Sequence, residues 1–282
     1  MPNRSLGLET LQGDTVYEEY WGLKEKPFEN TPDPKFLYYS RQHREALLNL
    51  EYAVRENKGA VMLTGDYGCG KTLLSRALIS KLEPDRFDVG LVANPLLSEE
   101  EFLQEVLYQL GFDQRPTAKA EILRHIEEVL FRNAQAEKIT IILIDEAQLI
   151  QSKVIFEELR LLLNFQLNDR FLLTLVLVGQ VELRAMVKAI PQFDQRIAIK
   201  CHLGALSPDD TKGLILHRLA VAGRTEPIFS EEAMALIHEH TEGTPRRINN
   251  ICDVSLLIGF SRGLKEVDVR LIRELISSEK EL

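Results

Sequence analysis

Short runs of apolar residues alternate along most of the chain with segments in which apolar residues recur every three or four positions. The runs are typical of buried parallel strands and lie at residues 60–63, 87–93, 139–146, 171–178 and 197–203. Helical spacing occupies residues 41–56, 73–82, 98–110, 118–135, 154–164 and 181–188. This alternation of strand and helix predicts an α/β fold with a doubly wound parallel sheet.

The strands stop at about Leu206. Four further helices are expected at residues 207–222, 230–240, 245–261 and 267–277. Ser207 and Ser230 are typical N-caps of the first two, and Gly243 follows the second. We therefore expect an α/β domain over residues 21–205, a C-terminal all-helical domain over 206–282 with a hinge near Leu206, and a flexible N-terminal arm over 1–20, where no periodicity is found.

The composition narrows the class of protein. The chain has 282 residues, 45% of them hydrophobic, which is enough for a substantial core. Its 34 basic and 43 acidic side chains give a net charge of −9, the opposite of the basic surface expected of a general nucleic-acid binder. The longest apolar run, residues 171–179, is far short of the roughly 20 residues that cross a bilayer.

The N-terminal residues and the cysteines indicate a compartment. Residues 1–15 contain one basic residue, Arg4, and no apolar block like that of a signal peptide, so we expect a cytoplasmic protein. Cys69, Cys201 and Cys252 are odd in number and have no metal-ligand spacing, in agreement with a reducing compartment.

A phosphate-binding loop of the form G-x-x-x-x-G-K-T follows the first predicted strand and precedes a helix. It consists of Gly65, Asp66, Tyr67, Gly68, Cys69, Gly70, Lys71 and Thr72, and Leu73 continues into the helix. The glycines let backbone amides approach phosphate oxygens at the helix N-terminus. Lys71 is predicted to neutralise the β- and γ-phosphates, and the Thr72 hydroxyl to ligate Mg²⁺. The pattern and its context predict nucleoside triphosphate binding by all nine residues.

Cys69 lies inside this loop and allows two interpretations. Converging amides would favour a thiolate, whose oxidation would block nucleotide entry. The interpretation that we favour is a small residue at a tolerant position.

Two carboxylates end the third predicted strand. Asp145 and Glu146 come directly after a run of β-branched and apolar residues, at the strand edge where open α/β sheets bind ligands. We assign Asp145 to Mg²⁺ and Glu146 to the attacking water, while an acidic pair that begins the next helix is the alternative. One strand separates the loop strand from this acidic strand in the sequence, so we expect the two not to pair directly.

Several motifs together resemble the AAA+ ATPases of the general secretion pathway protein A type over residues 20–277. They are GDYGCGKT, ILIDEAQ, LVLVGQVELR, QFDQRI, EGTPRRINNIC and the preceding YWGLKEKPFENTPDPKFLYYS. The WGLxxxPF opening and the GTPR element are the most restrictive of them. The resemblance implies hydrolysis of ATP with Mg²⁺, a nucleotide held between the sheet domain and a helical lid, and a homo-oligomer, with an ATP-dependent hexamer as one arrangement.

The resemblance also assigns three polar residues. Gln180 matches the sensor 1 position, Arg246 the sensor 2 arginine, and Arg196 is the candidate arginine finger for a neighbour's γ-phosphate. The alternatives are a helix-capping amide for Gln180, and Arg247 or a solvated helix surface for Arg246. Arg184 and Arg170 are rivals for the arginine finger.

Three functions fit this sequence. The first is an ATP-driven motor or switch in secretion, pilus or envelope assembly; relatives of this type continue into a membrane span and a wall-binding part, so we expect a separate membrane or envelope protein partner. The second is a DNA-associated regulator of the transposition-ATPase kind, with Lys153, Arg160 and Arg170 as a basic stripe, against which the net charge of −9 argues. The third is a nucleotide switch or scaffold that does not hydrolyse ATP.

Overall fold

A computed structural model describes residues 16–114, 116–168 and 170–279. Within these ranges, five strands form one parallel sheet in the order β2-β3-β4-β1-β5. The strands are β1 (Ala60–Gly65), β2 (Phe87–Val92), β3 (Ile139–Ile144), β4 (Leu173–Gly179) and β5 (Ile197–Leu203). β1 and β3 do not pair with each other, because β4 lies between them and pairs with both. The expected parallel α/β sheet is confirmed.

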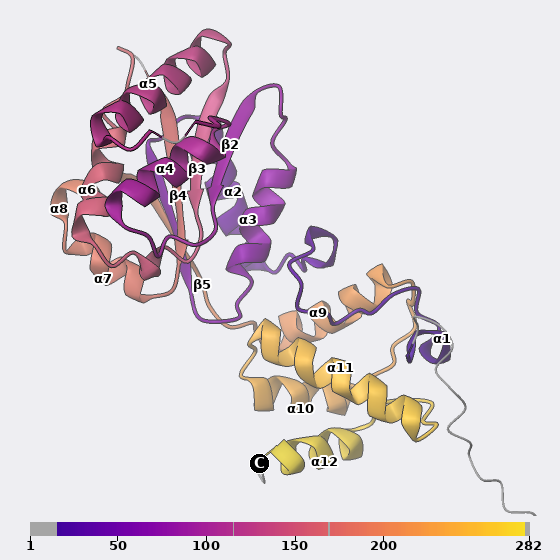
Figure 1. The fold of residues 1–282 in the computed structure, drawn as a ribbon. Helices are drawn as coiled ribbons and strands as arrows, with labels where there is room; N and C mark the ends of the chain where they lie inside the picture. Colours follow the sequence, from indigo (N-terminus) through magenta and orange to yellow (C-terminus); the bar gives the residue numbers. More distant parts are fainter. Residues whose placement is uncertain (1–15, 115, 169, 280–282) are drawn as a thin grey trace, which may run out of the picture. The chain divides into compact units, whose positions relative to one another are not determined.

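Helices cover both faces of the sheet, as Figure 1 shows. Alternate residues of the strands point to opposite faces, so Val61 and Leu63 pack on one side while Ala60 and Met62 pack on the other. The first side carries α2 (Arg41–Arg55) and α3 (Lys71–Ser80). The second carries α4 (Glu99–Gln109), α5 (Lys119–Gln135), α6 (Lys153–Leu162), α7 (Glu182–Lys188) and α8 (Pro191–Asp194). Because both faces are covered, β1, β3 and β4 read as nearly unbroken apolar runs.

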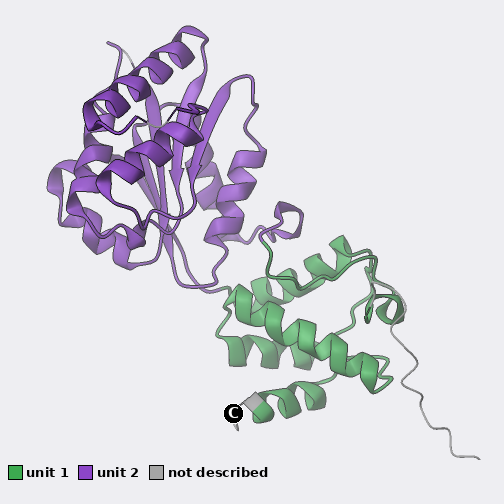
Figure 2. Cartoon of the chain, in the orientation of Figure 1, with its two compact units in different colours: residues 1–31, 206–282 green, residues 32–205 purple. Residues whose placement is uncertain are grey.

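A second compact unit is helical (Figure 2). Its helices are α9 (Pro208–Val221), α10 (Glu231–Thr241), α11 (Pro245–Ser261) and α12 (Val269–Glu279). Gly243, after α10, has φ of +71°, and a Cβ there would lie 2.2 Å from the backbone oxygen of Leu206. The Leu206 amide donates to the Gly243 carbonyl at 2.9 Å, so the chain enters this unit against a glycine that has no room for a side chain.

The helical unit also contains the described residues at the start of the chain. Residues 16–31 group with residues 206–279, whereas residues 32–205 form the sheet unit. This corrects the expected boundaries, which place residues 21–31 in the α/β domain and residues 16–20 in a flexible arm. Residues 18–21 instead form a short helix, α1 (Glu18–Trp21), while the rest of the expected arm, residues 1–15, lies outside the described residues.

Trp21 and Phe28 anchor this N-terminal segment. The Trp21 side chain is buried, its Nε1–H donates to the Leu256 carbonyl at 2.9 Å, and it packs where Gly259 of α11 leaves room. Phe28 meets Phe229 edge to face at 6.0 Å between ring centroids. The restrictive WGLxxxPF motif therefore has a packing role in the helical unit.

Most predicted helices and strands are found within two or three residues of their expected ends. The short elements were missed: α1, α8, and the 3-10 turns η1 (Pro34–Phe36) and η2 (Ala147–Leu149). The third strand ends at Ile144, two residues earlier than expected, because the chain turns at Glu146, whose φ is +49°. This early turn shapes the site described next.

Candidate nucleotide-binding site

The glycine-rich loop follows the carboxyl end of β1 and leads directly into α3. Gly68 and Gly70 have φ of +78° and +92°, in the left-handed region that glycine adopts without strain. Gly65 serves another purpose, since a Cβ there would lie 2.5 Å from the Leu203 carbonyl of β5. Cys69 is buried and Tyr67 is 65% exposed. The loop thus has the backbone path that directs amides toward an anion at the start of α3.

Lys71, the first residue of α3, folds back over the loop. Only 6% of it is exposed, and its Nζ donates to the Gly65 carbonyl at 3.1 Å and the Asp66 carbonyl at 2.9 Å. A buried ammonium is costly without acceptors, and here two backbone carbonyls supply them. The positive charge of Lys71 is therefore held beside the first two residues of the loop.

Thr72 and Asp145 meet across the end of the sheet. The Thr72 Oγ1–H donates to Asp145 Oδ2 at 2.9 Å, and the Glu146 amide donates to Asp145 Oδ1 at 2.9 Å. Asp145 is 8% exposed. Burial raises the pKa of its carboxyl above the ordinary value, and the hydrogen bond from Thr72 opposes that shift. The structure brings together a hydroxyl and a desolvated carboxylate, as the sequence predicts.

Glu146 lies beside this pair at the end of β3. Its backbone is left-handed, an unusual conformation for a residue with a side chain. Its Oε2 accepts a hydrogen bond of 2.6 Å from Gln148 Nε2, and Gln148 Oε1 accepts one of 2.9 Å from the backbone N–H of Gln180. Gln180 directly follows β4, so the two strand ends are linked through a single side chain.

Cys69 does not have the environment of a reactive thiolate. Burial raises the pKa of its thiol, the charge of Asp66 adds to the rise, and Lys71 only partly opposes it. Burial and the raised pKa disfavour the thiolate and support the interpretation of Cys69 as a small buried residue.

His43 of α2 contacts the backbone of the loop, and the sequence analysis does not identify it. Its ring is buried, with Nε2 3.1 Å from the Cys69 carbonyl and Nδ1 2.7 Å from Ser40 Oγ. A carbonyl can only accept, so Nε2 carries the proton and Nδ1 accepts from the Ser40 hydroxyl. Sequence reasoning had no signal for this contact, because the two residues meet only through the fold.

The arginine candidates lie at two different edges of the sheet. Arg196 directly precedes β5, so it lies at the edge opposite the loop, and its Nη2 donates to Asn164 Oδ1 at 3.1 Å. Arg170 precedes β4 at that same edge. Arg184 of α7 is at the same end of the sheet as the loop. Its Nε donates to Oγ1 of Thr64, the residue directly before Gly65, at 2.8 Å. Arg196 and Arg170 are thus separated from this chain's own loop, and Arg184 is next to it.

Comparisons with known proteins agree with this geometry. A family model described as an AAA domain matches residues 54–187, which include the loop, both carboxylates and Gln180. General secretion pathway protein A of Aeromonas hydrophila is 38% identical over 256 residues, 89% of this chain and 46% of that protein. The chain belongs to the AAA+ ATPase family. This AAA+ chain spans less than half the length of that relative.

Solved structures show the same fold as this AAA+ chain. The ORC2 protein of Aeropyrum pernix, in ADPNP and ADP complexes, has a TM-score of 0.69 and 18% identity over 90% of this chain and 71% of its own. Drosophila ORC bound to DNA has a TM-score of 0.66 and 15% identity over 97% of this chain and 68% of its own. At this identity the likeness supports the fold alone.

Arg246 lies in the helical unit of this AAA+ chain, in the first turn of α11 after Thr244 and Pro245. The neighbouring Arg247 donates from Nη2 to the His240 carbonyl at 2.9 Å, close to the end of α10. Arg247 therefore has a structural contact within its own unit. The sensor 2 assignment of Arg246 stays a prediction.

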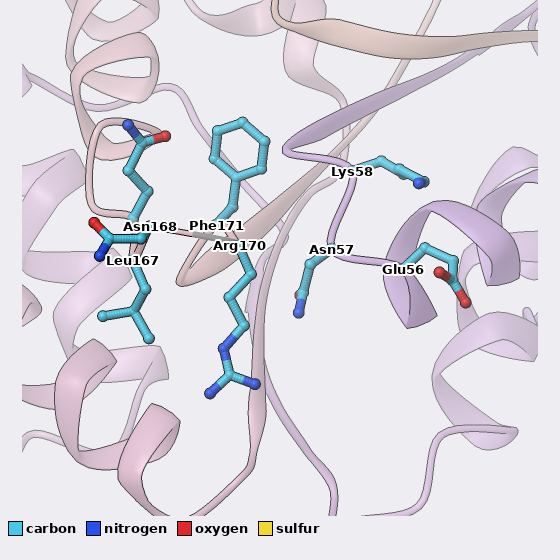
Figure 3. Close-up of a pocket in the computed structure, with 8 residues that line it drawn as sticks. Glu56, Asn57, Lys58, Leu167, Asn168, Arg170 and Phe171 are labelled. Carbon is cyan, nitrogen blue, oxygen red and sulfur yellow. The ribbon is translucent and has the colours of Figure 1, made fainter.

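A polar hollow lies at the edge of the sheet opposite the loop (Figure 3). Its lining comes from the turn before β1 and the segment before β4 and includes Asn57, Lys58, Arg170 and Phe171. It shares this edge with Arg196 and is separate from the loop.

Within the described ranges, no helix is both long and apolar enough to cross a bilayer.

Proposed function

We propose that this chain binds ATP with Mg²⁺ and hydrolyses it to ADP and phosphate, and that the cycle drives a conformational change or oligomer assembly in a secretion, pilus or envelope system. The observation that carries the proposal is the pairing of Thr72 with Asp145 at 2.9 Å beside a glycine loop, with Glu146 next in the chain. A hydroxyl at the start of α3 and two carboxylates after the end of β3 are groups that can hold a metal ion and position water for phosphoryl transfer.

The site fits a magnesium ion. Two oxygen atoms of Thr72 and Asp145 converge, and oxygen ligands are those that Mg²⁺ prefers. The carboxylate of Asp145 is desolvated with a raised pKa, an electrostatic cost that a cation would relieve. When bound, Mg²⁺ supplies neutralisation of charge on the phosphate oxygens.

Each assigned residue then has a role in hydrolysis. The Lys71 ammonium group, which donates to two loop carbonyls in the ligand-free chain, donates to phosphate oxygens when the nucleotide is bound. Glu146 accepts a proton from the attacking water. Gln180 contacts the γ-phosphate region from the end of β4, and Arg246 contacts the nucleotide from the helical unit. Arg196 contacts the nucleotide of a neighbouring copy, since it is at the edge of the sheet away from its own loop.

The proposed partners follow from the similarity to general secretion pathway protein A and from the position of Arg196. An arginine remote from its own loop can contact a nucleotide only when a second copy brings a loop to it. We therefore propose a homo-oligomer formed with ATP, a hexamer being the arrangement to look for. The similarity of the chain to general secretion pathway protein A supports the proposal of a cytoplasmic protein that acts through a membrane or envelope protein.

Calorimetric titration of the purified chain with ATP and with ADP, each with Mg²⁺, tests the proposal. We expect saturable binding of both nucleotides, phosphate release under multiple-turnover conditions, and an earlier gel-filtration peak with ATP than without. Absence of binding to either nucleotide would refute nucleotide function altogether. Bound ATP that stays intact for hours in single-turnover measurements would instead favour the nucleotide switch or scaffold.

A DNA-associated regulator is the second candidate. Lys153 and Arg160 share a face of α6, but Arg160 already donates to Glu157 Oε2 at 2.6 Å, which reduces the free positive charge. Duplex DNA that raises ATP turnover with a steep salt dependence would favour this function. No effect of DNA at low salt would exclude it.

Replacing Asp145 by Asn is expected to separate stability from binding. The raised pKa of Asp145 means that the folded, ligand-free state loses stability as pH rises from the ordinary pKa of an aspartate to the folded one. Asn removes that cost, and the Thr72 hydroxyl can reorient toward the new amide. At pH 7 the ligand-free variant should therefore melt at the same temperature as the wild type or higher, while the stabilisation by Mg²⁺ and ATP is lost.

Thermal unfolding with EDTA and with Mg²⁺ and ATP measures both effects. Thr72→Val is the matched comparison, because it removes the hydroxyl but keeps the desolvated carboxylate. A ligand-free Asp145→Asn protein that melts well below the wild type would contradict the account.

A further inference from the structure

Gln148 lies in η2, two residues after Glu146, and its side-chain amide spans the ends of two strands. Its Nε2 is 2.6 Å from Glu146 Oε2, and its Oε1 is 2.9 Å from the backbone nitrogen of Gln180. β3 leads into Glu146 and β4 into Gln180. One half-buried side chain thus connects the carboxylate assigned to water with the residue at the sensor 1 position.

The chemistry of the neighbours determines which way the amide of Gln148 points. The backbone N–H of Gln180 can only donate, so it must face Oε1. The Nε2–H group is then left to donate to the Glu146 carboxylate, which as an anion can only accept. Both bonds are satisfied in this orientation, and neither survives if the amide is reversed.

Gly179 provides the space that this amide occupies. A Cβ at Gly179 would lie 2.7 Å from Gln148 Oε1 and 2.9 Å from Leu183 Cδ2. No side-chain atom can be added at the end of β4 without displacing the amide. The absence of a side chain at Gly179 therefore leaves the space in which the amide of Gln148 and the side chain of Leu183 lie.

We propose that Gln148 is a positioning residue for hydrolysis: its amide holds the carboxylate of Glu146 in one rotamer and ties that carboxylate to the backbone of Gln180. A glutamate has three side-chain torsions, and ordering them in advance lowers the entropic cost of reaching the reactive geometry. Because Oε2 is engaged by the amide, Oε1 is the oxygen left to accept a proton from water. The inference rests on the proposed ATP hydrolysis.

Two substitutions of the same length separate this role from a merely structural one. Gln148→Met removes both hydrogen bonds. Gln148→Glu keeps an oxygen that accepts from the Gln180 N–H but places a second carboxylate against Glu146. If Gln148 acts on Glu146, both variants lower kcat by about 10- to 100-fold, the range for hydrogen bonds to charged groups, and Gln148→Glu loses at least as much as Gln148→Met.

ATP affinity should remain within about threefold of wild type in both variants, since Gln148 is neither a loop residue nor a predicted metal ligand. The measurements are kcat at saturating ATP, calorimetric Kd for ATP with Mg²⁺, and the melting temperature. Gly179→Ala crowds the same amide, together with the side chain of Leu183, without changing Gln148. As a single substitution, Gly179→Ala should lower kcat. In the Gln148→Met background it should lower kcat little further, because the effects of substitutions at contacting residues are not additive.

The outcomes distinguish the possible failures. A wild-type chain that binds no ATP refutes the proposed function itself. A wild type that hydrolyses ATP, with Gln148→Glu equally active, refutes the positioning role alone and leaves Gln148 as a support for the Gln180 backbone. A rise in Kd that accounts for the whole loss of activity also refutes it.

Discussion

Replacing Glu146 by Gln lowers the maximal rate of ATP hydrolysis by about 100- to 10,000-fold, the usual contribution of a general base, and leaves ATP binding within about threefold. Gln has the shape of Glu but cannot accept a proton from water. Its side-chain oxygen can still accept the hydrogen bond from Gln148 Nε2, so the local structure is retained. Phosphate release at saturating ATP and calorimetric Kd values check the two halves of this prediction.

The matched control for this variant is Glu232→Gln. Glu232 is an exposed residue of α10 in the helical unit, where the same change of charge should leave the rate unaffected. A Glu146→Gln protein that keeps a tenth or more of wild-type turnover shows that another group activates the water.

Replacing Lys71 by Met weakens ATP binding by about 100-fold or more, the loss expected when several charge-assisted hydrogen bonds to phosphate disappear. Met keeps the apolar stem of this buried side chain and removes only the ammonium group. The loss should therefore fall on nucleotide affinity, with turnover reduced at every accessible ATP concentration. Titration calorimetry with ATP and ADP measures it, and ADP should lose less because it lacks the γ-phosphate.

Lys265→Met is the control, because Lys265 is exposed and belongs to the helical unit. The variant at Lys71 also loses two hydrogen bonds to loop carbonyls, so its melting temperature must be recorded beside the affinity. Wild-type affinity in a folded Lys71→Met protein contradicts the assignment of the loop.

The predictions that succeeded are those in which a local pattern determines the structure. Ser207 and Ser230 are the N-caps that the sequence predicts, and their side chains accept hydrogen bonds from backbone N–H groups at the starts of α9 and α10. The loop residues and the acidic pair come from strands with unbroken apolar sequence, and parallel strands bring their carboxyl ends to one edge. Thr72 and Asp145, 73 positions apart, therefore meet as the sequence predicts.

The features that were missed depend on contacts between distant parts of the chain. The apolar residues Trp21 and Phe28 have no periodicity that names their partners, and those partners lie more than 200 positions away. His43 lies on a helix whose spacing explains its burial but not its contact with the Cys69 carbonyl. Gln148 was visible in the sequence, yet its role depends on Gly179 and Gln180, which only the order of the sheet brings beside it.

The discontinuous origin of the helical unit affects how this protein is made. Trp21 and Phe28 emerge from the ribosome before the sheet unit, whereas α11, which covers Trp21, is synthesised roughly 10 to 50 s after them at typical elongation rates. During that interval two large aromatic side chains have no native surface to cover them, while the sheet unit between them and α11 can already fold. Trp21 thus waits for a partner that lies 235 positions later in the sequence, and a chain that stops at residue 205 leaves both aromatic side chains exposed to chaperones and proteases.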